Sequence, residues 1–349
     1  MYGPSPTGMP AGSYPPYPPY QQGPWPAPAP GLKPRKKSRF GSLIVLVVVF
    51  VIVGPLVSSL FSSDLEPPRR PTPPAYTPPV PPGSPSSPGS GQYTPGSPDL
   101  NPDDPPYPAT ESEVDQALYS SPLYSQSLIP TQCEITAIDL VDAPVDDIEE
   151  HMNEFVDCLM AAWHPPVVSA GFALPHPSVT VYTHEINTAC GQVSMYNAAY
   201  CSADQQIYYA QNLILAFPSS VQTVRFLAES IIAHEFGHAV QYRTMIMTAE
   251  AYREYNALTD AEAMDDSRRL EMQADCFTGS FFNAVADSTH LTSSDEDNIS
   301  QIFTLLGGTI PYDDDHGMGA NRAYWVSQGM HDWSVGACNT FIAPADQVS

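Results

Sequence analysis

Residues 221–247 read VQTVRFLAESIIAHEFGHAVQYRTMIM, and this stretch decides the fold. Apolar residues recur at helical spacing from Val224 to Phe236, and no proline interrupts the stretch. The pattern predicts one long helix over the whole of it. A His-Glu-x-x-His sequence lies at its centre, and two histidines four residues apart lie on the same face of a helix.

These residues, His234, Glu235 and His238, have the composition of a zinc site. Both imidazoles can reach one tetrahedral metal ion, and Glu235 lies beside them, able to take a proton from a water on that metal. The alternative is a chance match on a core helix, which the strongly helical setting disfavours. The residues therefore predict Zn2+ as the cofactor, His234 and His238 as ligands, and Glu235 as the catalytic base.

A catalytic zinc usually has three protein ligands, and the third is expected from a following helix. Residues 259–286 have helical character and contain Glu271 and Asp275, again four residues apart on one face. This arrangement suits a carboxylate ligand beside a second carboxylate that hydrogen-bonds a ligand histidine and fixes its tautomer. The pattern also fits a solvated helix face, and four other residues compete for the role of third ligand: Glu262, Asp265, Asp266 and His290.

An apolar segment precedes this region. Residues 43–61 read LIVLVVVFVIVGPLVSSLF without a charge, which is enough helix to cross a hydrocarbon core of about 30 Å. The preceding KPRKKSR at 33–39 carries five positive charges, so the positive-inside rule places the N-terminus in the cytoplasm. A cleaved signal peptide is the alternative, but no A-x-A site follows the segment. We therefore expect a single-pass protein of the cell membrane whose C-terminal domain is extracytoplasmic.

Proline divides the chain. Most of its 40 prolines precede residue 110, and a segment of that composition cannot bury enough apolar surface to offset its ordering entropy. The sequence predicts four parts: a disordered Pro/Tyr-rich cytoplasmic tail at 1–40, a transmembrane helix at 41–62, a Pro/Ser/Gly-rich linker at 63–110 and one folded domain at 111–349. A module that binds proline-rich peptides is a candidate partner for the tail, although plain disorder explains its composition better.

The predicted domain is strongly acidic. From Glu111 onward the chain has six Arg, no Lys and 33 acidic residues, a formal net charge of −27 with His neutral. Non-specific binding of nucleic acid requires Lys and Arg contacts to phosphates, so we expect no nucleic-acid partner. The charge would favour cationic substrates, but a surface selected for solubility is the preferred explanation.

All six cysteines lie in the predicted domain: Cys133, Cys158, Cys190, Cys201, Cys276 and Cys338. An even number of cysteines on one side of a membrane segment indicates disulfides in an oxidising compartment. Six cysteines allow fifteen pairings, and their spacing does not choose among them. No C-x2-C pair occurs, which argues against zinc ligation by cysteine.

Four segments together resemble one family. HEFGHAVQ, RRLEMQADCFTG, HGMGANRAYWVSQGM and ACNTF are similar to the bacterial neutral zinc metallopeptidase family, which is gluzincin-like, and the chain resembles a membrane-anchored member of actinobacterial type. The resemblance extends over about residues 111–341 and includes CGQVSMYNAAYCSADQQIYY at 190–209. It implies that Glu271 is the third ligand and that Asp275 is its hydrogen-bonding partner behind the metal. It also implies disulfides Cys190–Cys201 and Cys276–Cys338, which leaves Cys133–Cys158 as the third pair.

His316 stands in a Gly-rich loop downstream of all three ligands. In peptidases of this type a late histidine often helps the metal to hold the tetrahedral oxyanion, so His316 is a second catalytic candidate. A surface-loop histidine without a catalytic role is an equal alternative.

Residues 179–183 and 206–210, rich in Val, Tyr and Ile, predict short strands. We expect an α+β fold, a zincin-like metallopeptidase domain with a small, mostly antiparallel sheet and zinc between its two active-site helices. The expected function is a membrane-anchored zinc metalloendopeptidase in which Glu235 is the general base for a zinc-activated water that attacks a peptide or protein substrate. The alternative is a catalytically inactive cell-surface binding module that zinc stabilises, and the retained Glu235 argues against it.

Overall fold

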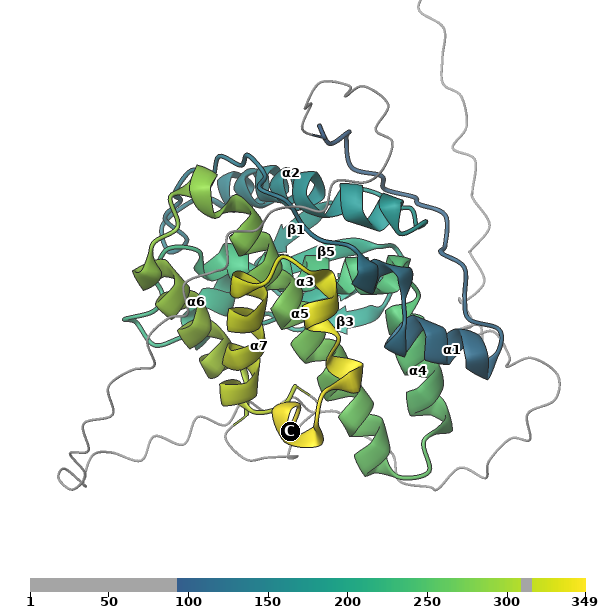
Figure 1. Ribbon diagram of the computed structural model, residues 1–349. Coiled ribbons are helices and arrows are strands. Elements are labelled where there is room, and N and C mark those ends of the chain that lie inside the picture. Colours follow the sequence, from purple (N-terminus) through teal and green to yellow (C-terminus); the bar gives the residue numbers. More distant parts are fainter. Residues whose placement is uncertain (1–92, 309–315) are drawn as a thin grey trace, which may run out of the picture. The chain divides into compact units, whose positions relative to one another are not determined.

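The computed structural model describes residues 93–308 and 316–349, and Figure 1 shows how their elements are arranged. The helices are α1 (Glu111–Tyr119), α2 (Val145–Ser169), α3 (Leu227–Arg243), α4 (Ile246–Asn256), α5 (Asp260–Thr289), α6 (Ser293–Leu306) and α7 (Gly319–His331). The strands are β1 (Val179–Tyr182), β2 (Ile186–Thr188), β3 (Gly191–Val193), β4 (Ala198–Cys201) and β5 (Gln206–Ala210). Short 3-10 helices include Pro122–Ser125 and Val335–Cys338.

The larger sheet has three strands in the order β1-β5-β4. β4 is antiparallel to β5, whereas β1 is parallel to β5, and β2 and β3 form a separate antiparallel hairpin. The parallel pair arises because residues 183–205 cross over between β1 and β5. The predicted α+β architecture with small sheets is confirmed, and two of the three strand pairs are antiparallel.

α3 is the central helix. It packs against α2, α5 and β4, and every one of its residues is buried. A helix buried on all sides needs no single apolar stripe, which leaves room for polar side chains on any face. The predicted helix over 221–247 is too long at both ends, because Phe226 and Met245 adopt left-handed backbone conformations with φ of 67° and 66°.

Residues 93–110, which the sequence assigns to the linker, pack against the folded domain. Gln206 Nε2 donates to the carbonyl of Asp99 at 3.0 Å, and Arg243 Nη1 donates to the carbonyl of Asp103 at 2.6 Å. An extended proline-rich chain leaves its carbonyls without partners of its own, so side chains of the domain can donate to them. The folded unit therefore begins N-terminal to the predicted boundary.

Three disulfides join Cys133 to Cys158, Cys190 to Cys201, and Cys276 to Cys338. This is the pairing that the family resemblance implies. The first holds the segment before α2 against α2, the second joins the residue before β3 to the end of β4, and the third joins α5 to the 3-10 helix Val335–Cys338. Each bond removes conformations from the unfolded chain and so stabilises the domain.

The predicted membrane segment at 41–62 lies outside the described residues, as do the tail at 1–40 and the linker as far as residue 92. Within 93–308 and 316–349, no helix is both long and apolar enough to cross a membrane. The anchor therefore remains a prediction from the sequence.

α4 carries a carboxyl group that is buried without a partner. Glu250 is 4% exposed, and its Oε1 has no hydrogen-bond partner among the described residues. Burial raises the pKa of Glu250 to about 8, and the charges of Glu254, Asp266 and Glu271 act in the same direction. In the folded protein Glu250 therefore keeps its proton at neutral pH, whereas in the unfolded chain it loses it above about pH 4.5.

We expect Glu250→Gln to stabilise the folded domain at neutral and alkaline pH. The pKa is raised in the folded state, so the wild-type protein loses stability as the pH rises from about 4.5 to about 8. The variant lacks this loss, and its free energy of unfolding should exceed that of the wild type by roughly 3–5 kcal/mol above pH 8. Urea unfolding of the zinc-free proteins across this range measures the difference, and a difference independent of pH would contradict the raised pKa. Glu134→Gln, which changes an exposed carboxylate that does not act on the pKa of Glu250, is the control.

Candidate metal centre

Two helices bring the metal-binding side chains together. His234 and His238 lie one turn apart on α3, with ring centroids 4.7 Å apart, and Glu271 projects from α5, which packs against α3. The helices approach closely at Gly237, where a Cβ would lie 3.1 Å from Ala274 Cα. A larger residue at position 237 would push the helices apart and move Glu271 away from the imidazoles.

The three side chains point their ligand atoms at one another. His234 Nε2 lies 3.2 Å from His238 Nε2 and 3.2 Å from Glu271 Oε2, and His238 Nε2 lies 3.4 Å from Glu271 Oε1. A tetrahedral zinc with bonds of about 2.0–2.1 Å holds its ligand atoms about 3.3–3.4 Å apart. The observed separations match that geometry. Within the described part of the chain, no other group of three His, Cys, Asp or Glu side chains meets closely enough to hold a metal.

The donor set suits zinc. Glu271 Oε2 is buried 3.2 Å from His234 Nε2, an atom that would itself bind the metal, so a cation between the two atoms would satisfy both. Two imidazole nitrogens and one carboxylate oxygen are a usual ligand set of catalytic zinc, with the fourth position left for water or substrate. The residues present therefore fit Zn2+ as the metal.

The other candidates for the third ligand have different partners. Asp265 and Asp266 pair with arginines at 2.7 Å and 3.0 Å. Glu262 belongs to the capping box at the N-terminus of α5, and His290 is the exposed residue at which that helix ends. The structure thus brings only Glu271, among these candidates, to the two histidines.

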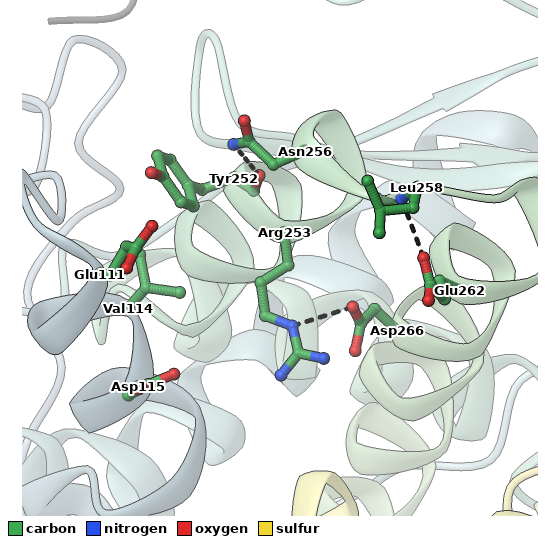
Figure 2. Close-up of a pocket in the computed structure, with 10 residues that line it drawn as sticks. Glu111, Val114, Asp115, Tyr252, Arg253, Asn256, Leu258, Glu262 and Asp266 are labelled. Atoms are coloured by element: carbon green, nitrogen blue, oxygen red, sulfur yellow. Dashed lines mark hydrogen bonds and ion pairs between the residues drawn. The ribbon is translucent and has the colours of Figure 1, made fainter. Parts of the chain in front are cut away.

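A surface pocket among α1, α4 and α5 is separate from this cluster (Figure 2). Its charged lining residues are four carboxylates and one arginine: Glu111, Asp115, Glu262, Asp266 and Arg253. Less polar residues complete the lining. Arg253 Nε donates to Asp266 at 3.0 Å, and Glu262 accepts the N–H of Leu258 at 2.8 Å. These charges hold the helices locally, and neither the two histidines nor Glu271 lines the pocket.

Asp275 and Arg322 lie behind His234. Asp275 Oδ1 lies 2.8 Å from His234 Nδ1, and Arg322 donates from Nε and Nη2 to the two Asp275 oxygens at 2.8 Å each. Burial would raise the pKa of Asp275, but the guanidinium and His234 outweigh it and hold the pKa below its ordinary value. The ionised Asp275 favours hydrogen on His234 Nδ1 and leaves Nε2 for a metal.

Arg322 is a site residue that sequence reasoning missed. It lies on α7, 47 residues after Asp275, and no spacing pattern connects the two positions. The side chain is buried, and its Nη1 also donates to the carbonyl of Leu306 at the end of α6 at 3.4 Å. Only the folded arrangement of α5, α6 and α7 reveals this ion pair.

Glu235 is held at the sheet edge. Its Oε2 accepts the N–H of Tyr200 in β4 at 2.7 Å, and the side chain is buried. This bond orients the carboxylate and leaves its other oxygen for proton transfer. The structure therefore places the predicted base, which follows His234 on α3, against the edge of the sheet.

His316 lies close enough to lower the pKa of Glu271. Burial would raise the pKa of Glu271, but the charges of His238 and His316, with hydrogen bonds from the two ligand histidines, hold it well below its usual range. His316 is half-buried at the start of the second described segment. Its catalytic role stays a prediction.

Comparison with known proteins identifies related chains. Residues 130–341 match the model of a family described as "Putative neutral zinc metallopeptidase". "Uncharacterized protein YpfJ" of Escherichia coli strain K12 is 26% identical over 209 residues, which cover 55% of this chain and 72% of the relative. "Uncharacterized protein Rv2575" of Mycobacterium tuberculosis strain H37Rv is 28% identical over 227 residues, with the same shares covered. No solved structure matches the chain significantly.

We expect Asp275→Asn to weaken zinc binding by about 10- to 100-fold, because the neutral amide no longer fixes the ring of His234 as strongly. The zinc dissociation constant is measured by competition with a chromophoric chelator. Asp265→Asn, which changes another carboxylate of α5, is the matched control and should bind zinc like the wild type.

If Asp275→Asn does not fold because Arg322 keeps an unpaired charge, Asp275→Asn combined with Arg322→Met removes the ion pair as a unit. Wild-type zinc affinity in a folded variant of either kind would contradict the role given to Asp275.

Proposed function

The chain belongs to the neutral zinc metallopeptidase family, and from this premise we propose that it is a zinc-dependent endopeptidase. The observation that carries the proposal is the spacing of the ligand atoms of His234, His238 and Glu271, which fits tetrahedral zinc. Glu235 follows the first of these ligands in the chain, where a base is required. A site that served stability alone would have no use for a base beside an open metal position.

The edge of the sheet supports a peptide as the substrate. In the antiparallel pair of β4 and β5, Asn197 accepts the N–H of Ala210, so Ala199 and Cys201 also face β5. The main-chain groups of Ala198 and Tyr200 then face the opposite edge, which is also where Glu235 bonds. A peptide added there as a further strand would pass beside Glu235. It would bond to the main-chain groups of Ala198 and to the carbonyl of Tyr200, since the Tyr200 N–H already bonds to Glu235.

The proposed chemistry assigns proton transfer to Glu235. Its carboxylate, oriented by the N–H of Tyr200, takes a proton from the attacking water and delivers it to the departing amine. Zinc bound by the three ligands would lower the pKa of water and polarise the scissile carbonyl. His316, whose charge acts on Glu271, is proposed to stabilise the negative charge that develops on the carbonyl oxygen.

We also propose that residues 41–62 anchor the enzyme in the cell membrane, with the N-terminus in the cytoplasm and the catalytic domain outside. Three disulfides support an oxidising compartment for that domain. The proposed partners are a peptide or protein substrate, the membrane, and a module that binds proline-rich peptides for the tail at 1–40. The acidic domain argues against nucleic acid as a partner.

Glu235→Gln should lower the rate of peptide cleavage by about 100-fold or more, because the amide cannot accept the proton, while zinc stays bound. The full-length protein and the variant are incubated in detergent with a peptide library, and products are identified by mass spectrometry. Bound zinc is measured on the same samples by atomic absorption. Glu262→Gln, which changes a capping residue of α5, is the control and should cleave like the wild type.

Cleavage by the wild type and by Glu262→Gln, but not by Glu235→Gln, would support the proposal. If the wild-type protein binds one zinc and cuts no peptide in the library, the inactive binding module replaces the peptidase as the preferred function. Equal cleavage by Glu235→Gln would contradict the role of Glu235.

A further inference from the structure

His238 has a different kind of support from His234. Its Nδ1 lies 2.8 Å from Oε1 of Gln241, which follows one turn later on α3 and is fully buried. An amide oxygen can only accept, so the hydrogen of the neutral imidazole must be on Nδ1. Nε2 then keeps its lone pair and faces His234 and Glu271. His238 is therefore set in the tautomer that binds a metal, without help from a carboxylate.

The orientation of the Gln241 amide follows from its other contacts. Its Nε2 donates to the carbonyl of Leu270 at 2.7 Å and to Oε1 of Gln273 at 3.2 Å. If the amide turned over, its oxygen would face the Leu270 carbonyl, and two acceptors would meet in a buried place. The main-chain carbonyl thus selects the orientation that presents Oε1 to His238.

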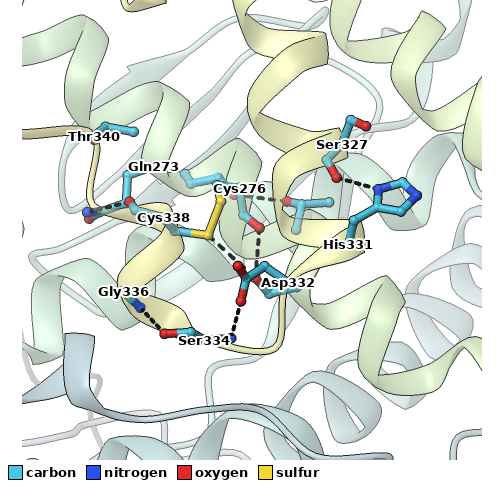
Figure 3. Close-up of a disulfide and its surroundings, with 12 residues drawn as sticks. Gln273, Cys276, Ser327, His331, Asp332, Ser334, Gly336, Cys338 and Thr340 are labelled. Atoms are coloured by element: carbon cyan, nitrogen blue, oxygen red, sulfur yellow. Dashed lines mark hydrogen bonds between the residues drawn. A yellow bond between two sulfur atoms is a disulfide. The ribbon is translucent and has the colours of Figure 1, made fainter. Parts of the chain in front are cut away.

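Gln273 on α5 continues the chain of amides. Its Nε2 donates to the Tyr124 hydroxyl at 2.9 Å and to the Cys338 carbonyl at 3.2 Å. This carbonyl also accepts only, so Gln273 must turn its Oε1 towards Gln241. Figure 3 shows Gln273 beside the disulfide that bonds Cys338 to Cys276 of α5, and this bond fixes the carbonyl relative to the helix.

We propose that Gln241 and Gln273 are positioning residues of the metal centre. The Leu270 and Cys338 carbonyls orient the two amides, and the amides hold His238 in its metal-binding tautomer. The inference rests on the zinc site of the proposed function, and its tests read metal binding, so an inactive peptidase with an intact zinc site would leave it standing.

The proposal makes the two histidines chemically unequal. His234 has an ionised carboxylate behind it, and that carboxylate is fixed by Arg322. His238 has only the oxygen of a neutral amide. A carboxylate raises the basicity of a ligand imidazole more than an amide does, so His238 is the weaker of the two donors.

If Gln241 and Gln273 had only a structural role, substituting them would lower the stability of the fold without a specific effect on zinc binding. Gln241 and Gln273 fill the interface between α3 and α5, and any change there removes hydrogen bonds. Two substitutions at position 241 separate the roles, because both Gln241→Glu and Gln241→Met lose the bonds that Nε2 donates to Leu270 and Gln273. Only Gln241→Glu keeps an oxygen that accepts from His238 Nδ1–H.

The experiment measures the zinc dissociation constant of the full-length protein in detergent by chelator competition. We expect Gln241→Met to weaken zinc binding by about 10- to 100-fold. Gln241→Glu should bind zinc at least as tightly as the wild type, although both variants should melt at lower temperature. Gln273→Met, one step further from the metal, should give a smaller loss than Gln241→Met.

Gln206→Met is the matched control. Gln206 is also a buried glutamine, and its amide donates to the main-chain carbonyls of Asp99 and Asp204. The control should therefore lower the melting temperature without changing zinc affinity. If Gln241→Glu loses as much affinity as Gln241→Met, or if Gln241→Met binds zinc like the wild type, the positioning role is overturned.

A spectroscopic measurement reads the tautomer directly. In zinc-loaded protein with 15N-labelled histidine, the Nδ1–H groups of His234 and His238 should each give a proton resonance protected from exchange. Gln241→Met should abolish protection at His238 and leave His234 unchanged. Protection of both rings in that variant would contradict the proposal even if the zinc affinity fell.

Discussion

The close contact between α3 and α5 is the constraint on which the site depends. Two ligand histidines come from one helix and the carboxylate ligand from the other, so their atoms meet only if the helix axes approach closely. Gly237 allows this approach, because any Cβ there would press on Ala274. Gly237 and Ala274 are small residues that face each other, and they mark a point of close contact between the two helices. The rest of the domain holds this pair in place, with α2 and β4 against α3 and α7 against α5.

Hydrogen bonds at Nδ1 of each ligand histidine, on the side away from the metal, connect these side chains to other helices. Arg322 connects His234, through Asp275, to α7, whereas Gln241 connects His238 to α5. The ion pair is buried, and removing one partner alone would leave an uncompensated charge. The two amides carry no net charge. Each has one favoured orientation, because Gln241 Nε2 donates to the Leu270 carbonyl and Gln273 Nε2 donates to the Cys338 carbonyl. Two different physical devices thus produce the same result, an imidazole with its hydrogen on Nδ1 and its lone pair on Nε2.

The sequence predicted the elements whose signal is local. The helix around His234 and the strand at 206–210 follow from side-chain periodicity, and the spacing of the two histidines carries the metal site. Two kinds of feature lay beyond such patterns. Arg322 and its partner are distant in the sequence and meet only through tertiary packing. The second kind departs from local sequence rules. α2 continues through Pro165 and Pro166, and residues other than glycine adopt left-handed backbone before α3 and α4 and after α5. Composition also misjudged residues 93–110, because a proline-rich chain without a core of its own can be bound by donors from another surface.

The packing of residues 93–110 determines how tension on the N-terminal side of the chain would enter the domain. The ring of Tyr93 stacks on His164 of α2, and the hydrogen bonds from Gln206 and Arg243 follow along the chain before α1 is reached. A force that pulled on the N-terminal side would load these contacts one after another in chain order, and each broken contact would release a short length of chain. Arg243 is the last residue of α3, the helix that carries His238. The contact with Arg243 therefore joins this segment to the metal-binding helix itself, and the contacts of Tyr93 and Asp99 precede it along the chain.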